Sequence, residues 1–141
     1  MRFWDTSALV PIVVVEPKSP IVRRWMAEDR NVVVWTLTRA ELLSALARKR
    51  RNTPAAREGL RTARRELLAV WERWAEVESV DLVRHHAERV VERYPLRAAE
   101  ALQIGAALVA AGQDAASLTF VTLDASQAEA AEAEGLRVLG P

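Results

Sequence analysis

Four acidic residues stand where this chain is expected to pass from a strand into a helix. Asp5 follows the first strand signal and Asp124 follows a later one, while Glu41 and Glu100 lie in the first turns of expected helices. Ligands of open α/β sheets bind outside the carboxyl ends of the strands. If the strands are parallel neighbours, these carboxylates can therefore converge on one edge. Carboxylate oxygens are suited to hard cations such as Mg²⁺.

Three of these acids also have a simpler interpretation as helix caps. Asp5 can cap the helix that follows it, since aspartate is among the preferred N-cap residues. Thr38-x-x-Glu41 and Asp124-x-x-Gln127 both fit the capping-box pattern, in which the side chains satisfy free backbone N–H groups. Taken one at a time, these residues leave both interpretations open.

Glu100 is harder to explain as a surface residue. An ion pair with Arg97, one turn away, would contribute only about 0.2–0.5 kcal/mol on a solvated helix face. The segment 96–109 is apolar on nearly every side, which predicts a mostly buried helix. A buried carboxylate needs a compensating cation.

Length and composition predict one globular domain over residues 1–141. Half of the residues are hydrophobic and 28% are charged, the net charge is +1, and there is no cysteine. Thiolate metal sites, disulfides and cysteine nucleophiles are thereby excluded. No apolar run reaches the roughly 18 residues of a membrane span, and no signal-type segment begins the chain. We therefore expect a cytoplasmic protein without membrane contact.

Strand and helix signals alternate along the chain. Strands are expected over 2–4, 32–35, 77–80, 120–123 and 137–139. Helices are expected over 8–16, 21–26, 38–51, from Pro54 onward, and over 81–94, 96–111 and 125–134. This alternation predicts a parallel sheet covered on both faces.

Four segments carrying the acids resemble, in order and at the expected length, the PIN-domain ribonucleases, and among them the VapC toxins of toxin–antitoxin pairs. They are residues 5–9, 37–41, 96–104 and 120–124. The resemblance covers essentially the whole chain. It implies a PIN-like three-layer sandwich, with a central parallel sheet of about four to five strands flanked by helices.

The resemblance also implies a metal site. The positions that match the family's acidic cluster, which holds Mg²⁺ or Mn²⁺, are Asp5, Glu41, Glu100 and Asp124. Ser7 and Thr122 match positions where small hydroxyl residues often accompany the acids. On this basis Asp5 and Glu100 are expected to be direct ligands. Asp124 is expected to bind a second metal or to act through water, and Glu41 to orient or deprotonate the attacking water.

Glu100 departs from the family, which usually has aspartate at this position. The extra methylene extends the carboxylate by about 1.5 Å. Since Mg²⁺ demands near-ideal octahedral geometry, metal preference or rate can change. We nevertheless expect an active enzyme, because a flexible side chain can retract.

The expected function is that of a metal-dependent endoribonuclease, the toxin of a type II toxin–antitoxin system, which cleaves RNA phosphodiester bonds with a metal-activated water. Its expected partners are RNA, a cognate antitoxin protein and a second copy of the chain. An antitoxin segment would bind in a groove formed by residues 8–15, the apolar face of 21–26 and the helix from Pro54. Two alternatives remain: a catalytically weakened PIN-like module that only binds a partner, and a PIN nuclease with a housekeeping role in RNA processing.

Two other acid-rich folds fit less well. A receiver-type phosphoacceptor domain needs a lysine after a late strand, whereas Lys18 and Lys49 are the only lysines. A haloacid-dehalogenase-type phosphatase needs Asp-x-Asp at its first strand, whereas Asp5 is followed by Thr6 and Ser7.

Basic residues are concentrated in two neighbouring runs. They are Arg48, Lys49, Arg50 and Arg51, and then Arg57, Arg61, Arg64 and Arg65. These side chains could contact RNA phosphates. Equally, the first run could complement a helix C-terminus and the second could coat a solvated face.

Overall fold

The first strand of the chain occupies the middle of a five-stranded parallel sheet. The computed structural model describes all 141 residues. Its strands are β1 (Arg2–Trp4), β2 (Val32–Trp35), β3 (Ala75–Val77), β4 (Thr119–Val121) and β5 (Arg137–Leu139). They lie in the order β3-β2-β1-β4-β5, and every neighbouring pair is parallel. This arrangement places the carboxyl ends of all five strands at one edge.

The register between β1 and β4 brings two chemically important positions together. Phe3 lies opposite Phe120, and Trp4 lies opposite Val121. The ladder continues one step further, because the backbone N–H of Asp5 donates to the carbonyl of Val121 at 2.9 Å. The side chains just beyond the two strand ends therefore leave the sheet side by side.

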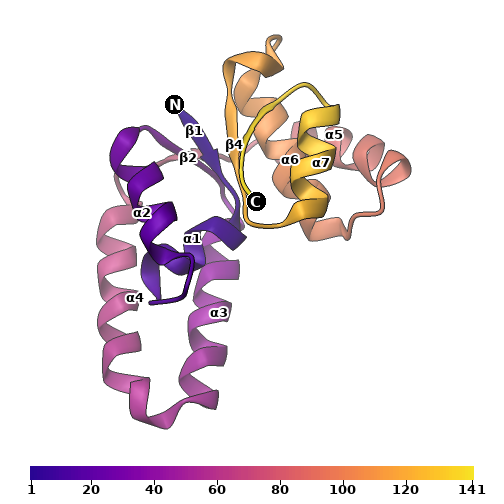
Figure 1. Cartoon of the computed structure of the whole chain (residues 1–141). Coiled ribbons are helices and arrows are strands. Elements are labelled where there is room, and N and C mark those ends of the chain that lie inside the picture. Colours follow the sequence, from indigo (N-terminus) through magenta and orange to yellow (C-terminus); the bar gives the residue numbers. More distant parts are fainter.

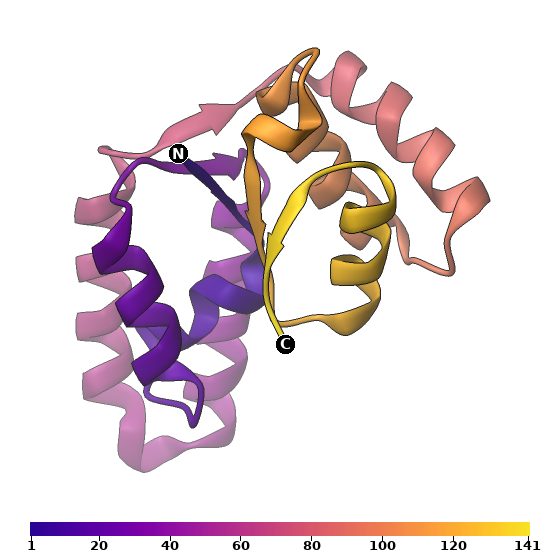
Figure 2. The same cartoon turned by 45° about the horizontal axis from the view of Figure 1, so that its top comes forward.

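Seven α-helices cover the two faces of the sheet, as Figures 1 and 2 show from two directions. One layer contains α1 (Thr6–Val13), α2 (Ser19–Glu28), α3 (Thr38–Asn52) and α4 (Arg57–Trp71). The other contains α5 (Val80–Arg93), α6 (Ala98–Ala111) and α7 (Ala125–Ala133). Two 3₁₀ turns, η1 (Pro54–Ala56) and η2 (Ala115–Ser117), precede α4 and β4.

Alternation of side chains along β1 supplies both halves of the core. Phe3 points toward α5–α7 and stacks on Phe120 with ring centroids 5.7 Å apart. Trp4 points to the opposite face and packs in the same cluster as Trp71 of α4. All four of these aromatic side chains are 1% exposed or less. Burial on both faces fixes the position of β1, and so of the residue that follows it.

The structure confirms the expected α/β fold with a central parallel sheet between two helical layers. One strand is displaced: the expected strand 77–80 is β3 at Ala75–Val77, and α5 begins at Val80. Only Val77 of this edge strand is buried, so little apolar signal marks its start. Pro54 opens the 3₁₀ turn η1 rather than α4, and the Thr53 side chain makes no capping bond.

Helices α3 and α4 form an antiparallel pair joined through η1. In Figure 1 this pair extends well beyond the edge of the sheet, with the turn between the helices at its far end. The start of α3 lies at the sheet, while its last turn lies at the tip of the pair. No helix of the structure combines the length and the apolar character needed to cross a membrane.

Candidate functional site

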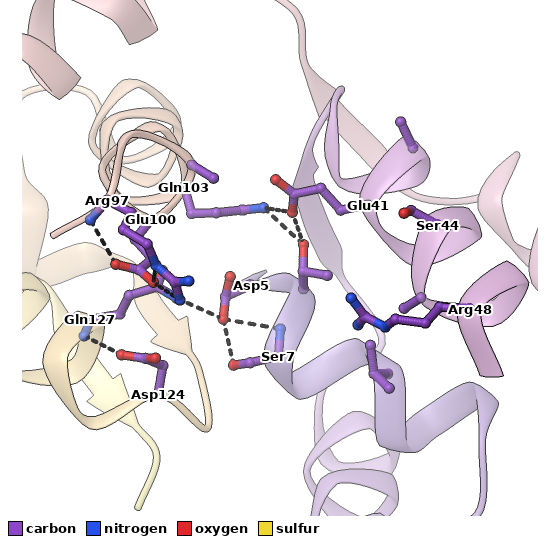
Figure 3. A pocket seen from close by; sticks show the side chains of 15 residues that line it. Asp5, Ser7, Glu41, Ser44, Arg48, Arg97, Glu100, Gln103, Asp124 and Gln127 are labelled. Atoms are coloured by element: carbon purple, nitrogen blue, oxygen red, sulfur yellow. Dashed lines mark hydrogen bonds and ion pairs between the residues drawn. The ribbon is translucent and has the colours of Figure 1, made fainter. Parts of the chain in front are cut away.

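All four acids expected from the sequence line one cleft of about 730 Å³ at the carboxyl edge of the sheet (Figure 3). Asp5 occupies the middle, with Glu41 on one side and Glu100 and Asp124 on the other. We call this hollow the acidic cleft. Its other lining residues are Thr6, Ser7, Val10, Ala40, Ser44, Ala45, Arg48, Arg97, Ala99, Gln103 and Gln127.

Asp5 is almost completely buried, with 2% of its surface exposed. Its Oδ2 atom accepts hydrogen bonds from the Ser7 N–H (3.1 Å), the Ser7 hydroxyl (2.5 Å), the Thr122 hydroxyl (3.0 Å) and Gln127 Nε2 (3.2 Å). The bond from the Ser7 N–H is an N-cap of α1, so the capping interpretation of Asp5 is correct as far as it goes. All four bonds end on one oxygen, and Oδ1 accepts none.

Burial raises the pKa of the Asp5 carboxyl group above its ordinary value, and the charge of Glu41 acts in the same direction. The hydrogen bonds from Ser7 and Thr122 lower the pKa, but they do not outweigh the loss of hydration. The Asp5 anion is therefore under-stabilised by the protein alone, and a cation beside it would correct this imbalance.

The hydroxyl groups of Ser7 and Thr122 are oriented by the loop that leaves β4. Ser7 Oγ accepts from the Leu123 N–H at 2.9 Å, and Thr122 Oγ1 accepts from the Asp124 N–H at 3.1 Å. Because each oxygen already accepts a backbone hydrogen bond, its own proton is free to point at Asp5. The two residues expected as supporting hydroxyls thus hold the central carboxylate in place.

Glu41 does not cap α3, although its sequence pattern allowed that interpretation. Helix α3 has no side-chain cap, and the Glu41 carboxylate instead accepts hydrogen bonds from the Thr6 hydroxyl and from Gln103 Nε2, the latter at 2.9 Å. Gln103 is 1% exposed, and the same Nε2 lies 3.0 Å from both Thr6 Oγ1 and Thr38 Oγ1. The amide therefore ties α1, α3 and α6 together behind Glu41.

Glu100 is paired with Arg97, the simpler of its two interpretations. Arg97 Nε and Nη2 lie 2.8 and 2.6 Å from Oε1, and the Arg97 N–H donates to Oε2 at 2.8 Å. Burial acts to raise the pKa of Glu100, but these hydrogen bonds and the Arg97 charge outweigh it and hold the pKa below its ordinary value. The Arg97 side chain is 86% exposed, so it can leave this position without unfolding the helix.

Asp124 caps α7 by accepting the Gln127 N–H on Oδ1 at 2.8 Å. The expected capping box is only half formed, because the Gln127 side chain reaches Asp5 rather than returning to Asp124. Gln127 Oε1 is buried without a hydrogen-bond partner. A second polar atom near Asp5 thus lacks a partner within the protein.

The donor set fits a hard divalent cation, although the ligands are not yet gathered around one point. No three acidic or histidine side chains stand close enough to hold a metal ion as they are. The acidic cleft nevertheless offers four carboxylates against two guanidinium groups, Arg48 and Arg97. It also presents Asp5 Oδ1 free of hydrogen bonds at its centre. Carboxylate oxygens without thiolate or imidazole favour Mg²⁺ or Mn²⁺ over zinc.

The sequence interpretation missed the two buried amides of the cleft. Gln103 lies one turn after Glu100 in the same apolar helix, so the apolar pattern that predicts burial of Glu100 predicts burial of Gln103 as well. The local sequence pattern indicates only one role for Gln127, as a capping partner of Asp124. Its contact with Asp5, 122 positions earlier in the chain, has no local sequence signal.

Comparisons with known proteins agree with this architecture. The PIN domain family model matches residues 2–139, and the chain therefore belongs to the PIN domain family, whose members are generally nucleases. Comparison with curated proteins gives no significant match.

Two solved structures share the fold over nearly the whole chain. The crystal structure of FitAcB from Neisseria gonorrhoeae is 20% identical, with a TM-score of 0.63 over 99% of this chain and 96% of that chain. The structure of FitAB bound to an IR36 DNA fragment is 18% identical, with a TM-score of 0.65 over 100% of this chain and 95% of that chain. At these identities the likeness establishes the fold.

Replacing Asp5 with asparagine separates capping from metal binding. Asparagine caps helices about as well as aspartate, so Asp5→Asn is expected to fold and, without metal, to melt at or above the wild-type temperature, since a buried charge is removed. Affinity for Mg²⁺ or Mn²⁺ should fall at least about 10- to 100-fold. Calorimetric titration and thermal melts measure both effects, and unchanged metal affinity would remove Asp5 from the site.

Glu100 is tested with a neutral and a shortened side chain. Glu100→Gln should lose metal affinity while folding normally, and Glu100→Asp, which restores the usual family residue, should keep it. If Glu100 serves only as the partner of Arg97, then Glu100→Gln costs a few tenths of a kcal/mol of stability and leaves metal affinity intact. The same titrations distinguish these results.

Proposed function

We propose that this PIN domain is a Mg²⁺- or Mn²⁺-dependent endoribonuclease that acts in the cytoplasm as the toxin of a type II toxin–antitoxin pair. The observation that carries the proposal is the buried Asp5 carboxylate, which keeps one oxygen free at the centre of a cleft lined by Glu41, Glu100 and Asp124. An unpartnered anion of this kind is costly unless a cation or a reacting group uses it.

Each residue of the acidic cleft has a part in the proposed reaction. Asp5 and Glu100 would hold the metal ion, with Asp124 contributing through water or to a second ion. A divalent cation held there would polarise the phosphodiester and lower the pKa of an attacking water. Glu41, held by Thr6 and Gln103, is placed to orient or deprotonate that water.

The two arginines of the cleft offset part of its negative charge. Arg48 and Arg97 both line it, and either guanidinium can neutralise a phosphate oxygen of the substrate. In the structure Arg97 is bound to Glu100, and engagement of Glu100 as a metal ligand would free this guanidinium to bind a phosphate.

One observation favours a second candidate function. Glu100 is fully engaged by Arg97, and no three acids stand together as a ready ligand set. A catalytically weakened PIN module that only binds a partner would have these same two features. A PIN nuclease with a housekeeping role shares the same chemistry and differs only in its substrate.

Metal-dependent cleavage separates these functions. The purified protein should cut RNA with Mg²⁺ or Mn²⁺ and should stop in EDTA, and Asp5→Asn should reduce the rate by orders of magnitude with metal present. Gel analysis of end-labelled RNA reports the cut positions. A folded Asp5→Asn protein that cleaves RNA at the wild-type rate would contradict the mechanism, and a wild-type protein inactive with every metal would favour the binding module.

The proposed partners are an antitoxin and a second copy of the chain. A groove of about 360 Å³ between α2 and α4 combines apolar side chains with three arginines. The apolar residues are Ile12, Met26, Ala27, Val32, Val70 and Trp74, and the arginines are Arg23, Arg30 and Arg73. Such a groove suits an apolar segment with acidic flanks.

Expression tests the toxin role directly. Production of the wild-type protein in a bacterial host should arrest growth, Asp5→Asn should relieve the arrest, and co-production of the protein encoded by the neighbouring gene should also relieve it. Light scattering at micromolar concentration should give the mass of a dimer. Normal growth with an active nuclease in the cell would contradict the toxin role, and a strict monomer would contradict the dimer.

A further inference from the structure

The fold separates basic residues that lie close together in the sequence. Arg48 lines the acidic cleft, and Lys49 is paired with Glu16 at 2.5 Å. Arg50 lines a different hollow. At about 100° per residue, Arg48 and Arg50 leave α3 about 200° apart, on opposite sides of the helix.

Four arginines gather in a second cavity, of about 530 Å³, between the last turn of α3 and the middle of α4. They are Arg50, Arg61, Arg64 and Arg65, and we call them the arginine cluster. The three from α4 share one face of that helix, because residues three and four positions apart are neighbours. Leu68, one turn further along the same face, is the fifth lining residue.

No acidic side chain neutralises the arginine cluster. All four arginines are exposed, and none takes part in an ion pair. The one side-chain hydrogen bond among them joins Arg65 to Thr62 at 3.4 Å. Like charges at this spacing destabilise a helix, so the arrangement carries a cost that an anionic ligand would offset.

We propose that the arginine cluster is a second binding site for nucleic acid, which holds backbone phosphates of the RNA outside the acidic cleft. This inference rests on the proposed ribonuclease function. Arginine is suited to the task because its planar fork binds phosphate oxygens through two parallel hydrogen bonds. Four such groups around one hollow can hold successive phosphates of a strand.

The position of the cluster sets a minimum length for the RNA that uses both sites. Glu41 and Arg50 are nine residues apart on α3, which is about 14 Å along the helix axis. With an axial spacing of about 3.4 Å per nucleotide in a stacked strand, a stacked RNA must extend at least about four nucleotides beyond the cleft. Because the cluster lies on the other side of α3, the strand must also pass around the helix.

The lining of the cavity favours a polyanion over a protein partner. Protein interfaces take most of their binding energy from apolar and aromatic anchors in desolvated pockets. This cavity offers four guanidinium groups and one leucine. The apolar groove beside α2, by contrast, combines six apolar residues with three arginines.

The test measures RNA binding in EDTA, where the proposed nuclease is inactive. Fluorescence polarisation of a labelled 30-nucleotide RNA compares the wild type with Arg61→Gln/Arg64→Gln. The matched control is Arg24→Gln/Arg84→Gln, which removes two exposed charges on α2 and α5. Melting curves establish that all three proteins are folded.

We expect the cluster variant to bind more weakly and to respond less to salt. Each lost phosphate contact lowers the slope of log affinity against log salt by about 0.7, or about 1.4 for two. Between 50 and 200 mM salt, wild-type affinity should therefore fall about sevenfold more than that of the variant. The control should follow the wild type.

Three outcomes would overturn the proposal: equal affinity and slope for the two double variants, competition by an acidic peptide but not by unlabelled RNA, or a preference for DNA of the same length.

The result of this binding test is independent of catalysis. If the wild type cleaves RNA with metal but binding does not depend on the cluster, the second site fails and the nuclease stands. If the wild type never cleaves RNA but binding depends on the arginine cluster, the second site stands and the proposed nuclease function fails.

Discussion

A carboxylate buried at the end of the central strand must be compensated from within the protein, and the architecture around Asp5 follows from that requirement. Four donors from α1, the end of β4 and α7 converge on Oδ2. The parallel pairing of β1 with β4 brings Thr122 beside Asp5, and the cap of α7 brings Gln127 within reach. Compensation remains incomplete, since the pKa of Asp5 stays raised. The Asp5 side chain is thus held rigidly, while its Oδ1 atom accepts no hydrogen bond and is available. A metal ligand requires this combination.

Much of this organisation could be predicted from local patterns. The alternation of β-branched runs with helical stretches gave the layered sheet, and the position of Asp5 and Asp124 after strands placed them at one edge. The long apolar helix around Glu100 is buried as expected, with Ile104 and Ala106 fully covered. The predicted position of strand β3 was wrong by two to three residues, because an edge strand with one buried residue carries almost no periodic signal.

What could not be predicted depends on contacts between distant segments. Whether Glu41 caps its own helix or meets Gln103 depends on how α3 and α6 pack, 62 positions apart in sequence. Arg48 and Arg50, two positions apart, lie on different surfaces because successive residues of an α-helix are rotated by about 100° about its axis. This separation is not visible in the linear sequence. Glu100 pairs with Arg97, as opposite charges three residues apart on a helix commonly do. In this orientation the expected metal ligands do not lie around one point.

The central position of β1 has a consequence for synthesis on the ribosome. Asp5 is made well before two of its partners, because its contacts with Thr122 and Gln127 span 117 and 122 positions. At about 5–20 residues per second, the last of these donors follows about 6–24 s later. During that interval β1 can pair with β2 but has no partner on its other side, because β4 has not yet been made. A chain that stalls before residue 119 therefore carries three of the four acids without the neighbour that holds the first, and whatever chemistry the cleft performs begins only after residues 119–127 have been made.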